Sequence, residues 1–316
     1  MTLDEARPLV GAIEAGGTKF VCAVGTGPGD LVRAEFPTSR DPSVVLTSVV
    51  NWLEGQQGER GVLRAIGIGS FGPLDLHPRS PSFGFITSTP KPGWRNTDIV
   101  GAVQSTFADV PVAFDTDVNA AALGERRWGN GVGLSDLVYV TIGTGIGAGA
   151  LVGGRLVHGL VHPEMGHMLL PRLPDDTFPS VCPFHGACWE GLCSGPALLA
   201  RTGLPPEQIA ADHPAWALET HYTALALANL ALVLSPQRII LGGSVRKAGL
   251  LGSERFFQML RNRFQSELGG YLASPVVAEG IDSFIVAPML GDDAGVCGAI
   301  ALALSALASG EQGGGS

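Results

Sequence analysis

The sequence is short of charged and aromatic residues. Charged side chains make up 16% of its 316 residues and aromatic ones 7%, whereas 45% are hydrophobic. A chain of this composition can bury a sizeable core, so we expect a globular protein rather than a disordered one. The formal net charge of −9 disfavours a general nucleic-acid surface. It does not exclude an anionic substrate, because a nest of backbone amides can bind phosphate inside an acidic protein.

Targeting and membrane signals are also missing. The N-terminus is acidic and lacks the basic and apolar regions of a signal peptide. No apolar run approaches the roughly 18 residues of a membrane span. The five cysteines are an odd number without a secretory context, which favours free or metal-bound thiols in a reducing compartment. We therefore expect a cytoplasmic protein that binds neither membranes nor nucleic acid.

The common nucleotide-binding patterns are absent as well, since neither a P-loop nor a Rossmann glycine pattern opens a helix. Glycine itself is abundant, at 45 residues. Three glycine turns stand at the ends of predicted strands: EAGGTK (14–19), GTGIG (143–147) and LGGS (241–244). Glycines let backbone amides approach phosphate oxygens closely, although each turn taken singly is also explained as hairpin chemistry. Three such turns favour a nucleotide site of a less common kind.

The order of predicted elements indicates an α/β protein with two lobes. The hairpin pattern LVGAIEAGGTKFVCAVG returns as LVYVTIGTGIGAGALVGGRLV, and alternating helices and strands follow each copy. We expect a small lobe over residues 1–116, completed by the C-terminal helix, and a large lobe over 117–308. The glycine-rich residues 309–316 should form a disordered tail.

The segment FDTDVNAAALGE places two carboxylates where a predicted strand enters a helix. Asp115 and Asp117 stand at this junction. A carboxylate here can accept the proton of a substrate hydroxyl that lies within hydrogen-bond reach. It can equally be a helix N-cap, the ordinary role of such a residue. The spacing alone leaves both interpretations open.

The stretch CPFHGAC predicts a metal site. Together with His167 it offers the ligands of a tetrahedral structural zinc: His167, Cys182, His185 and Cys188. The alternative is a disulfide between the two cysteines, which a cytoplasmic setting disfavours and which leaves the histidine unexplained. Cys193 is a substitute ligand, but it lies off the regular spacing. Cys22 and Cys297 stand in apolar contexts typical of core residues.

Two glutamates flank the predicted metal site. Glu164 precedes His167 by three residues, and Glu190 follows Cys188 by two. A metal that fixes those ligands would also fix the glutamates, which suits them for hydrogen bonds to sugar hydroxyls. Two merely solvated glutamates are the alternative.

These motifs together resemble the ROK family of sugar kinases, over roughly residues 11–308. GAIEAGGTKFVCAVG resembles the family's first phosphate hairpin, DTDVNAAALGE its catalytic segment, VTIGTGIGAG its second phosphate hairpin and PEMGH its sugar and zinc motif. LGGS resembles the adenosine-side loop. Glu14, Thr116 and the single histidine of the zinc loop depart from many members. That loop, the IEAGGTKF opening and the TPKPGW segment look like the bacterial fructokinase branch.

The resemblance implies a two-lobed actin-like, ribonuclease H-like sugar kinase fold with a cleft between the lobes. It implies phosphorylation of a hexose 6-hydroxyl by ATP and Mg²⁺, with structural Zn²⁺ and a homodimeric assembly. Asp117 would be the general base. The expected sugar-binding residues are Gly93, Trp94, Thr116, Glu164, His167 and Glu190. The expected ATP-binding residues are Gly16, Gly17, Thr18, Lys19, Thr144, Gly145, Pro196, Gly242 and Gly243.

Fructose is the leading acceptor on this resemblance. A glucokinase, mannokinase or amino-sugar kinase with the same machinery is the alternative, because acceptor choice depends on a few hydrogen bonds. A sugar-sensing repressor of the same family would need a helix-turn-helix domain before the first hairpin. Only ten residues precede residue 11 here, which disfavours a repressor. A zinc-structural scaffold without catalysis would not need Asp117.

Overall fold

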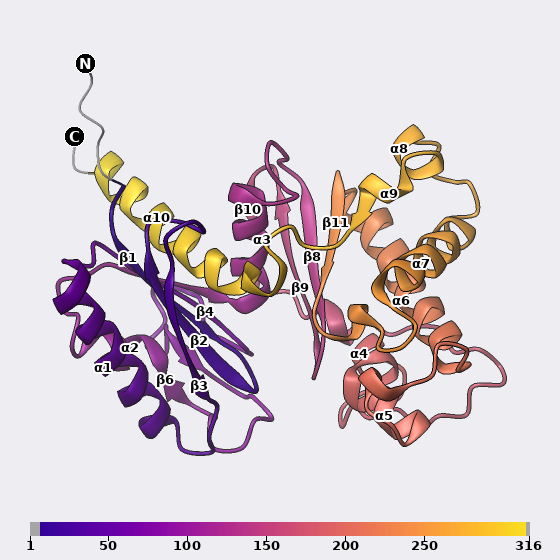
Figure 1. The fold of residues 1–316 in the computed structure, drawn as a ribbon, viewed down its shortest axis with the longest axis horizontal. Coiled ribbons are helices and arrows are strands. Elements are labelled where there is room, and N and C mark those ends of the chain that lie inside the picture. Colours follow the sequence, from indigo (N-terminus) through magenta and orange to yellow (C-terminus); the bar gives the residue numbers. More distant parts are fainter. Residues whose placement is uncertain (1–6, 314–316) are drawn as a thin grey trace. The chain divides into compact units, whose positions relative to one another are not determined.

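The chain folds into two compact units in the computed structural model, which describes residues 7–313 (Figure 1). Unit 1 holds the described residues up to Val132, the segment His158–His162 and the chain from Asp293 onward. Unit 2 holds Gly133–Val157 and Pro163–Asp292. The first unit thus ends after Val132 and not after Thr116, because the helix that begins at Asp117 packs against the C-terminal helix of unit 1.

Unit 1 is built on a five-stranded sheet of order β3-β2-β1-β4-β7. The predicted hairpin forms β1 and β2, which pair antiparallel, and β3 continues the meander. β4 pairs parallel with β1, and β7 pairs parallel with β4. A two-stranded sheet, β5–β6, lies apart from it. The bounds are β1 Val10–Ala15, β2 Lys19–Gly25, β3 Val32–Pro37, β4 Ile66–Ser70, β5 Phe85–Ile86, β6 Thr97–Asp98 and β7 Val112–Thr116.

Alternation along β1 distributes its side chains between two cores. Ile13 belongs to a core with helices α1 and α2, and Ala12 to a core with helix α10. Successive side chains of a strand point to opposite faces, so the sheet is covered on both sides. Asp41 caps α1 by accepting from the N–H of Ser43, as the Asp-Pro signal predicts. The helices are α1 Pro42–Arg60, α2 Ile99–Gln104, α3 Asp117–Trp128 and α10 Ala294–Gly313.

Unit 2 repeats the sheet of unit 1. Its order is β10-β9-β8-β11-β12, with an antiparallel β8–β9 hairpin and parallel β8–β11 and β11–β12 pairs. The predicted recurrence of the hairpin therefore reflects a repeated topology. The bounds are β8 Leu137–Ile142, β9 Ile146–Val152, β10 Arg155–Leu156, β11 Arg238–Gly242 and β12 Ile285–Val286. The last strand has only two residues and follows directly on helix α9.

The helices of unit 2 pack around a single large core in which α6 and α7 lie side by side. α6 contributes Tyr222 and Leu227 to this core, and α7 contributes Phe256 and Phe264. The α-helices are α4 Trp189–Cys193, α5 Gly195–Thr202, α6 Ala215–Leu234, α7 Ser253–Leu268, α8 Pro275–Ala278 and α9 Ile281–Phe284. Short 3-10 turns are η1 Met165–His167, η2 Pro206–Gln208, η3 Val245–Lys247 and η4 Gly291–Asp293.

Two expectations about the apolar segments need correction. Helix α10 extends to Gly313, so residues 309–313 of the expected tail are helical, while 314–316 lie outside the described residues. Two helical segments, Ala215–Leu234 and Gly291–Ala308, are long and apolar enough to span a membrane, contrary to the sequence expectation. Of their spanning windows, 61% and 56% respectively are buried inside the protein. A helix of such composition is typical of a protein core, which explains both without a membrane.

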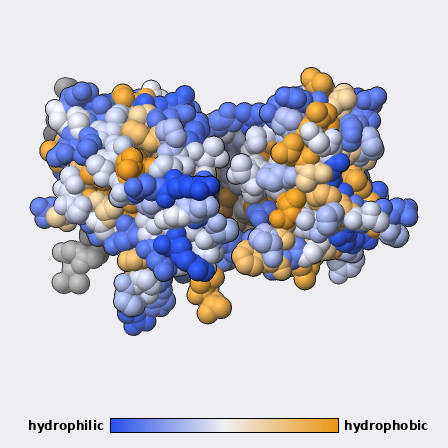
Figure 2. All heavy atoms as spheres, turned by 90° about the horizontal axis from the view of Figure 1, so that it is seen from below, coloured by the Kyte–Doolittle hydropathy of each residue, from blue (hydrophilic) through white to orange (hydrophobic). Residues whose placement is uncertain are grey.

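On the face shown in Figure 2, apolar side chains are interspersed with hydrophilic ones. Several large apolar residues are exposed in the described chain, among them Leu160 and Phe184. Scattered apolar residues of this kind are normal on protein surfaces and identify no partner by themselves.

Candidate functional site

The first glycine turn, at the end of the β1–β2 hairpin, is held by neighbouring groups through its carbonyls. The N–H of Gly16 donates to the carbonyl of Lys19 at 3.0 Å, which closes the turn. Thr38 donates its hydroxyl to the Gly16 carbonyl at 2.8 Å and its N–H to the Thr18 carbonyl at 2.9 Å. Space around Gly17 is open, since a Cβ there would meet nothing within 4 Å. Hydrogen bonds to the carbonyls of Gly16 and Thr18 therefore hold the turn in place, while the space next to the Cα of Gly17 is unfilled.

Two lysines lie near this turn, and they have different partners. Lys19, which the sequence predicted to bind ATP, forms an exposed ion pair with Glu35 at 2.6 Å. Lys91 instead donates from Nζ to the carbonyl of Gly17. Lys91 stands in the TPKPGW segment, yet only Gly93 and Trp94 of that segment were predicted as site residues. Lys91 and Gly17 are 74 residues apart in the sequence, so no local sequence pattern indicates this contact, and it was not predicted from the sequence.

The loop that carries Lys91 is anchored in the core of unit 1. Trp94 is fully buried, its Nε1 donates to the Ser39 carbonyl at 2.8 Å, and its ring lies 5.2 Å from that of Phe20. Gly93 has a φ of +86°, and a Cβ there would lie 1.9 Å from the Arg40 carbonyl oxygen. Only glycine fits this position. The indole of Trp94 therefore faces the core and anchors the loop.

The predicted base, Asp117, is the first residue of α3, directly after β7. Thr116 caps the helix by accepting from the N–H of Asn119 at 3.1 Å, so its side chain performs the N-cap role. The Asp117 carboxylate accepts from the N–H of Val118 at 2.9 Å. The side chain of Thr116, and not that of Asp117, therefore caps the helix, and the role of Asp117 as a proton acceptor stays a prediction.

Two carboxyl groups of unit 1 are held in an environment that favours their protonated form. Burial, followed by the charges of Asp117 and Asp293, raises the pKa of Glu14 to about 8, although Lys19 opposes the shift. Burial raises the pKa of Asp117 to about 6. One oxygen of Glu14, Oε2, is buried without a hydrogen-bond partner among the described residues. The orphaned oxygen of Glu14, together with the negative charges of Asp117 and Asp293 that act on this carboxyl, is an environment that a hard divalent cation such as Mg²⁺ would suit.

A hydrogen-bonded pair of the buried Asp115 and the exposed His158 lies next to Asp117 and was not predicted as part of the site. Asp115 accepts from Asn119 at 2.8 Å, and its other oxygen lies 2.7 Å from Nε2 of His158. The hydrogen bond to Asp115 raises the pKa of His158, although partial burial opposes the shift. This pair ties segment His158–His162 to the end of β7. The sequence signal for Asp115 was present, but nothing in it indicated His158.

In unit 2 the four predicted metal ligands come together. The donor atoms of His167, Cys182, His185 and Cys188 all lie within 4.8 Å of one another. Nδ1 of His167 lies 3.8 Å from the Cys182 sulfur and 3.7 Å from the Cys188 sulfur. Ligands about 2.2 Å from a tetrahedral zinc would lie about 3.6 Å from each other. Cys182 and Cys188 are free thiols in this structure, and Cys193 is buried in the core outside the cluster.

Glu190 connects the metal-ligand cluster to the second glycine turn. Its Oε2 accepts from the N–H of Ile146 at 2.9 Å, directly after Gly145. Its Oε1 lies 3.9 Å from Nε2 of His167, whose other ring nitrogen faces the sulfurs. Glu164 stands before η1, where its carbonyl accepts from the N–H of His167 at 2.9 Å. Both predicted sugar-binding glutamates of unit 2 thus contact His167, Glu190 at its ring and Glu164 at its backbone.

The loop that carries Cys182 and His185 is held by two arginines, Arg201 and Arg172. Arg201 of α5 forms a two-point ion pair with Asp176 at 2.7 and 2.8 Å, and Tyr222 donates to the same carboxylate at 2.7 Å. These bonds hold the pKa of Asp176 well below its usual range. Arg172 donates to the carbonyls of Asp176 and Gly186. The segment around Asp176 that leads into the loop is therefore held in place by an ion pair and hydrogen bonds within unit 2.

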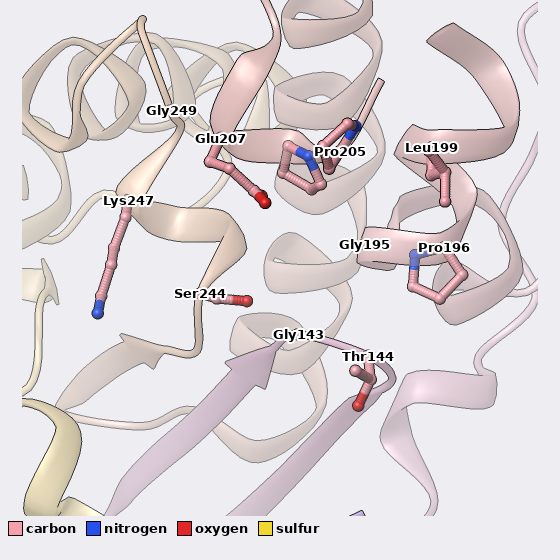
Figure 3. A pocket seen from close by; sticks show the side chains of 11 residues that line it. Gly143, Thr144, Gly195, Pro196, Leu199, Pro205, Glu207, Ser244, Lys247 and Gly249 are labelled. Carbon is pink, nitrogen blue, oxygen red and sulfur yellow. The ribbon is translucent and has the colours of Figure 1, made fainter. Parts of the chain in front are cut away.

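A cavity of about 480 Å³ opens beside the second glycine turn. The N–H of Gly195, at the start of α5, donates to the Gly143 carbonyl at 2.7 Å and joins the turn to the cavity wall. Figure 3 shows the Glu207 carboxyl and the Ser244 hydroxyl pointing into the cavity, while Lys247 points away. Lys247 is paired with Asp292 at 2.9 Å. The lining residues are Gly143, Thr144, Gly195, Pro196, Leu199, Pro205, Pro206, Glu207, Ser244, Lys247 and Gly249.

The predicted nucleotide-binding residues of unit 2 fall into two groups. Thr144 and Pro196 line the cavity. Gly145 and Gly243 are each next in sequence to a residue that lines it, Thr144 and Ser244 respectively, and Gly242 is the last residue of β11. Gly243 has a φ of +83°, and a Cβ on it would lie 2.3 Å from the Ile142 carbonyl oxygen. Gly242 and Gly243 thus let β11 end close to β8 and leave Ser244 to face the cavity. A largely apolar cavity of this volume with a few polar groups suits a small organic ligand.

Comparison with known proteins points to one family. The model of the ROK family matches residues 10–306. A putative fructokinase of Bacillus subtilis (strain 168) is 45% identical over 308 residues, 96% of this chain and 99% of its own. A fructokinase of Pediococcus pentosaceus is 42% identical over 95% of this chain and 99% of its own. Glucokinases are more distant, for example 29% identical in Halalkalibacterium halodurans over 90% of this chain.

Solved structures agree with the sequence comparison. A ROK hexokinase from Thermus thermophilus has a TM-score of 0.75 at 27% identity, covering 95% of this chain and 99% of its own. A ROK glucokinase from Streptomyces griseus, solved with glucose and AMPPNP, has a TM-score of 0.73 at 26% identity over 94% and 99%. The expected α/β, actin-like fold is confirmed. The chain belongs to the ROK family.

Proposed function

We propose that the protein is an ATP-dependent fructokinase that converts D-fructose to D-fructose 6-phosphate. The observation that carries this proposal is the division among its relatives. Five of them, at 39–45% identity, are named fructokinase or putative fructokinase, whereas relatives named glucokinase reach 27–29%. The site residues of both units support kinase chemistry of this kind.

Asp117 is the general base in this proposal. Its carboxylate accepts the proton of the fructose 6-hydroxyl, and the hydroxyl oxygen forms a bond to the γ-phosphorus of ATP. The bond from that phosphorus to the oxygen of ADP breaks, and its electron pair leaves with ADP. A raised pKa suits this role, because a base is most effective when its pKa lies near the working pH.

Glu164, His167 and Glu190 bind the sugar in this proposal, together with Thr116 and the loop backbone near Gly93 and Trp94. Glu190 is preorganised, because the N–H of Ile146 holds one of its oxygens and leaves the other beside His167. Fixed acceptors and donors of this kind recognise hydroxyl groups with good geometry. The proposal gives Trp94 an anchoring role, in keeping with its burial.

The nucleotide is held by both glycine turns in this proposal. Amides near Gly16, Gly17 and Thr18 and those of Thr144 and Gly145 take the phosphates, with Lys19 nearby. The nucleoside occupies the cavity beside Pro196, and Gly242 and Gly243 let the chain approach β8 just before Ser244, which lines that cavity. Glu14 and Asp293 would hold the Mg²⁺ that accompanies ATP and supplies positive charge to its phosphates.

Zn²⁺ is the metal that we assign to the cluster of His167, Cys182, His185 and Cys188. Two thiolates and two imidazoles at tetrahedral spacing form a typical structural zinc set. With all four protein ligands in place, such a site does no chemistry of its own. When bound, the ion would fix the His167 ring beside Glu190, whose other oxygen is held by the N–H of Ile146.

The setting that fits this function is the cytoplasm, where ATP and free thiols are available. We propose a homodimer on the family resemblance, and we propose no nucleic-acid or membrane partner.

An ATP-coupled assay over a panel of hexoses tests the proposed function. We expect kcat/KM for fructose to exceed the values for glucose, mannose and amino sugars, with fructose 6-phosphate identified by mass spectrometry and NMR. Equal rates on all sugars would reject a dedicated fructokinase, and a preference for glucose or an amino sugar would reassign the acceptor. Binding of sugar without turnover would favour a sensor.

A further inference from the structure

We propose that Lys91 is the cation of unit 1 that contacts the transferring phosphoryl group. This assignment rests on the proposed function and adds a further catalytic residue to it. The two lysines near the first glycine turn have different partners. Lys91 donates to the Gly17 carbonyl of the turn, whereas Lys19 forms an ion pair with Glu35.

The position of Lys91 is set by the backbone around it. Its Nζ donates to the carbonyl of Gly17, the residue at the open part of the turn. The N–H of Lys91 reaches the Thr89 hydroxyl at 3.3 Å, and its carbonyl accepts from the N–H of Trp94 at 3.2 Å. Prolines on both sides of Lys91 restrict its backbone further. The side chain is partly buried, so less of its conformational entropy remains to be lost when it binds an anion.

The chemistry of an ammonium group at this place points to phosphate. An ammonium has three N–H donors, and the Gly17 carbonyl takes one of them. The remaining donors can serve phosphate oxygens that approach the amides of the turn. Phosphoryl transfer depends on positive charge placed where the phosphate oxygens gather negative charge. The other lysine, Lys19, has its charge engaged by Glu35.

The decisive experiment is steady-state kinetics of Lys91→Met, Lys91→Gln and Lys91→Arg. We expect Lys91→Met to lower kcat about 100-fold, the usual effect of removing one charge-stabilising donor, with little change in KM for fructose. Lys91→Gln keeps an N–H donor for the Gly17 carbonyl but removes the positive charge. Its kcat should therefore be as low as that of Lys91→Met, although the first glycine turn keeps this hydrogen bond. Lys91→Arg should restore part of kcat. Arg95→Met, which removes an exposed cation of the same loop, is the matched control.

A binding measurement separates this proposal from the identity of the sugar. By calorimetry without any sugar, Lys91→Gln should weaken AMPPNP more than ADP and leave AMP unchanged. If the wild type does not phosphorylate fructose but the variant shows this order, the proposed acceptor fails and the role of Lys91 stands. Three results would overturn the role: unchanged kcat in Lys91→Gln, a raised KM for fructose at constant kcat, or a larger loss of kcat in Lys19→Met.

Discussion

The two glycine turns of this protein occupy the same place in two sheets of the same topology, yet different groups surround them. Each turn closes an antiparallel hairpin whose inner strand pairs with a parallel neighbour. Around the first turn lie ionisable side chains, Glu14, Lys91 and Asp117. Around the second lie fixed partners, Glu190 and the start of α5 at Gly195.

The difference suggests a division of work between the units. Unit 1 presents groups that change or balance charge, as phosphoryl transfer requires. Unit 2 presents groups that are already fixed, either by the metal-ligand cluster or by buried ion pairs, as recognition requires. The same topology can thus serve both purposes, because most of the side chains around each turn, such as Lys91, Asp117 and Glu190, come from elements outside the hairpin.

The largest expected effect concerns unit 1 and the proton acceptor that we propose there, Asp117. Asp117→Asn should lower kcat by about 10²–10⁴-fold, because the amide cannot accept the proton of the substrate hydroxyl. In the wild type, kcat/KM should rise with pH through about 6, where the raised pKa of Asp117 converts the carboxyl into a base. The measurement is a pH profile of both proteins. Asp109→Asn, an exposed aspartate of the same unit, is the control.

If Asp117→Asn keeps more than a tenth of wild-type kcat, Asp117 is not the base and unit 1 does not hold the proton acceptor proposed for it.

The next effect concerns the buried ion pair of unit 2. We expect it in the free energy of unfolding rather than in the rate of phosphorylation. Asp176→Asn breaks the buried pair with Arg201 and leaves the guanidinium uncompensated, which should cost about 3–5 kcal/mol of unfolding free energy. The pKa of Asp176 is depressed, so its contribution is present at neutral pH and disappears as pH falls through the folded-state value. Urea unfolding at pH 7 measures the loss. The exposed Asp175 provides the control, Asp175→Asn.

Metal removal tests whether the cluster serves recognition. Cys188→Ser should reduce the zinc content from about one ion per chain. It should also raise KM for fructose on the order of tenfold, because without the metal the His167 ring is no longer held in place beside Glu190. Cys193→Ser, outside the cluster, should retain zinc. Elemental analysis and kinetics are the measurements. A zinc-free wild type with a Cys182–Cys188 disulfide would remove the metal assignment.

The smallest effect should come from the charge-balancing Glu14. Its folded-state pKa of about 8 exceeds the ordinary value of 4.5, so its stabilising contribution is fully present below 4.5 and is lost as pH rises through 8. Glu14→Gln should therefore raise the melting temperature relative to wild type more at pH 9 than at pH 5, without nucleotide or Mg²⁺. Glu35→Gln, an exposed glutamate, should show no such pH dependence. An equal shift at both pH values would contradict a buried, protonated Glu14.

Much of this protein is predictable from sequence because its signals are local. The strand-like runs around a glycine turn predicted the two hairpins, and the recurrence of this pattern predicted two related units. The ligand spacing in CPFHGAC, joined to His167, predicted the cluster that the structure brings together. A C-terminal helix was also predicted, but its end at Gly313, beyond residue 308, was missed because a helix can extend through a glycine when its earlier turns are packed.

Only the tertiary structure decided which charged groups serve each turn. Nothing in the residues around Lys91 or His158 indicates that one reaches Gly17 and the other Asp115, because each contact joins segments far apart in the chain. The sequence by itself determined the elements, the turns and the metal ligands, which depend on neighbours within a few residues. Burial of Glu14 and the pairing of Lys19 depend on how strands, loops and helix α10 pack together, and that packing sets the electrostatics of the site.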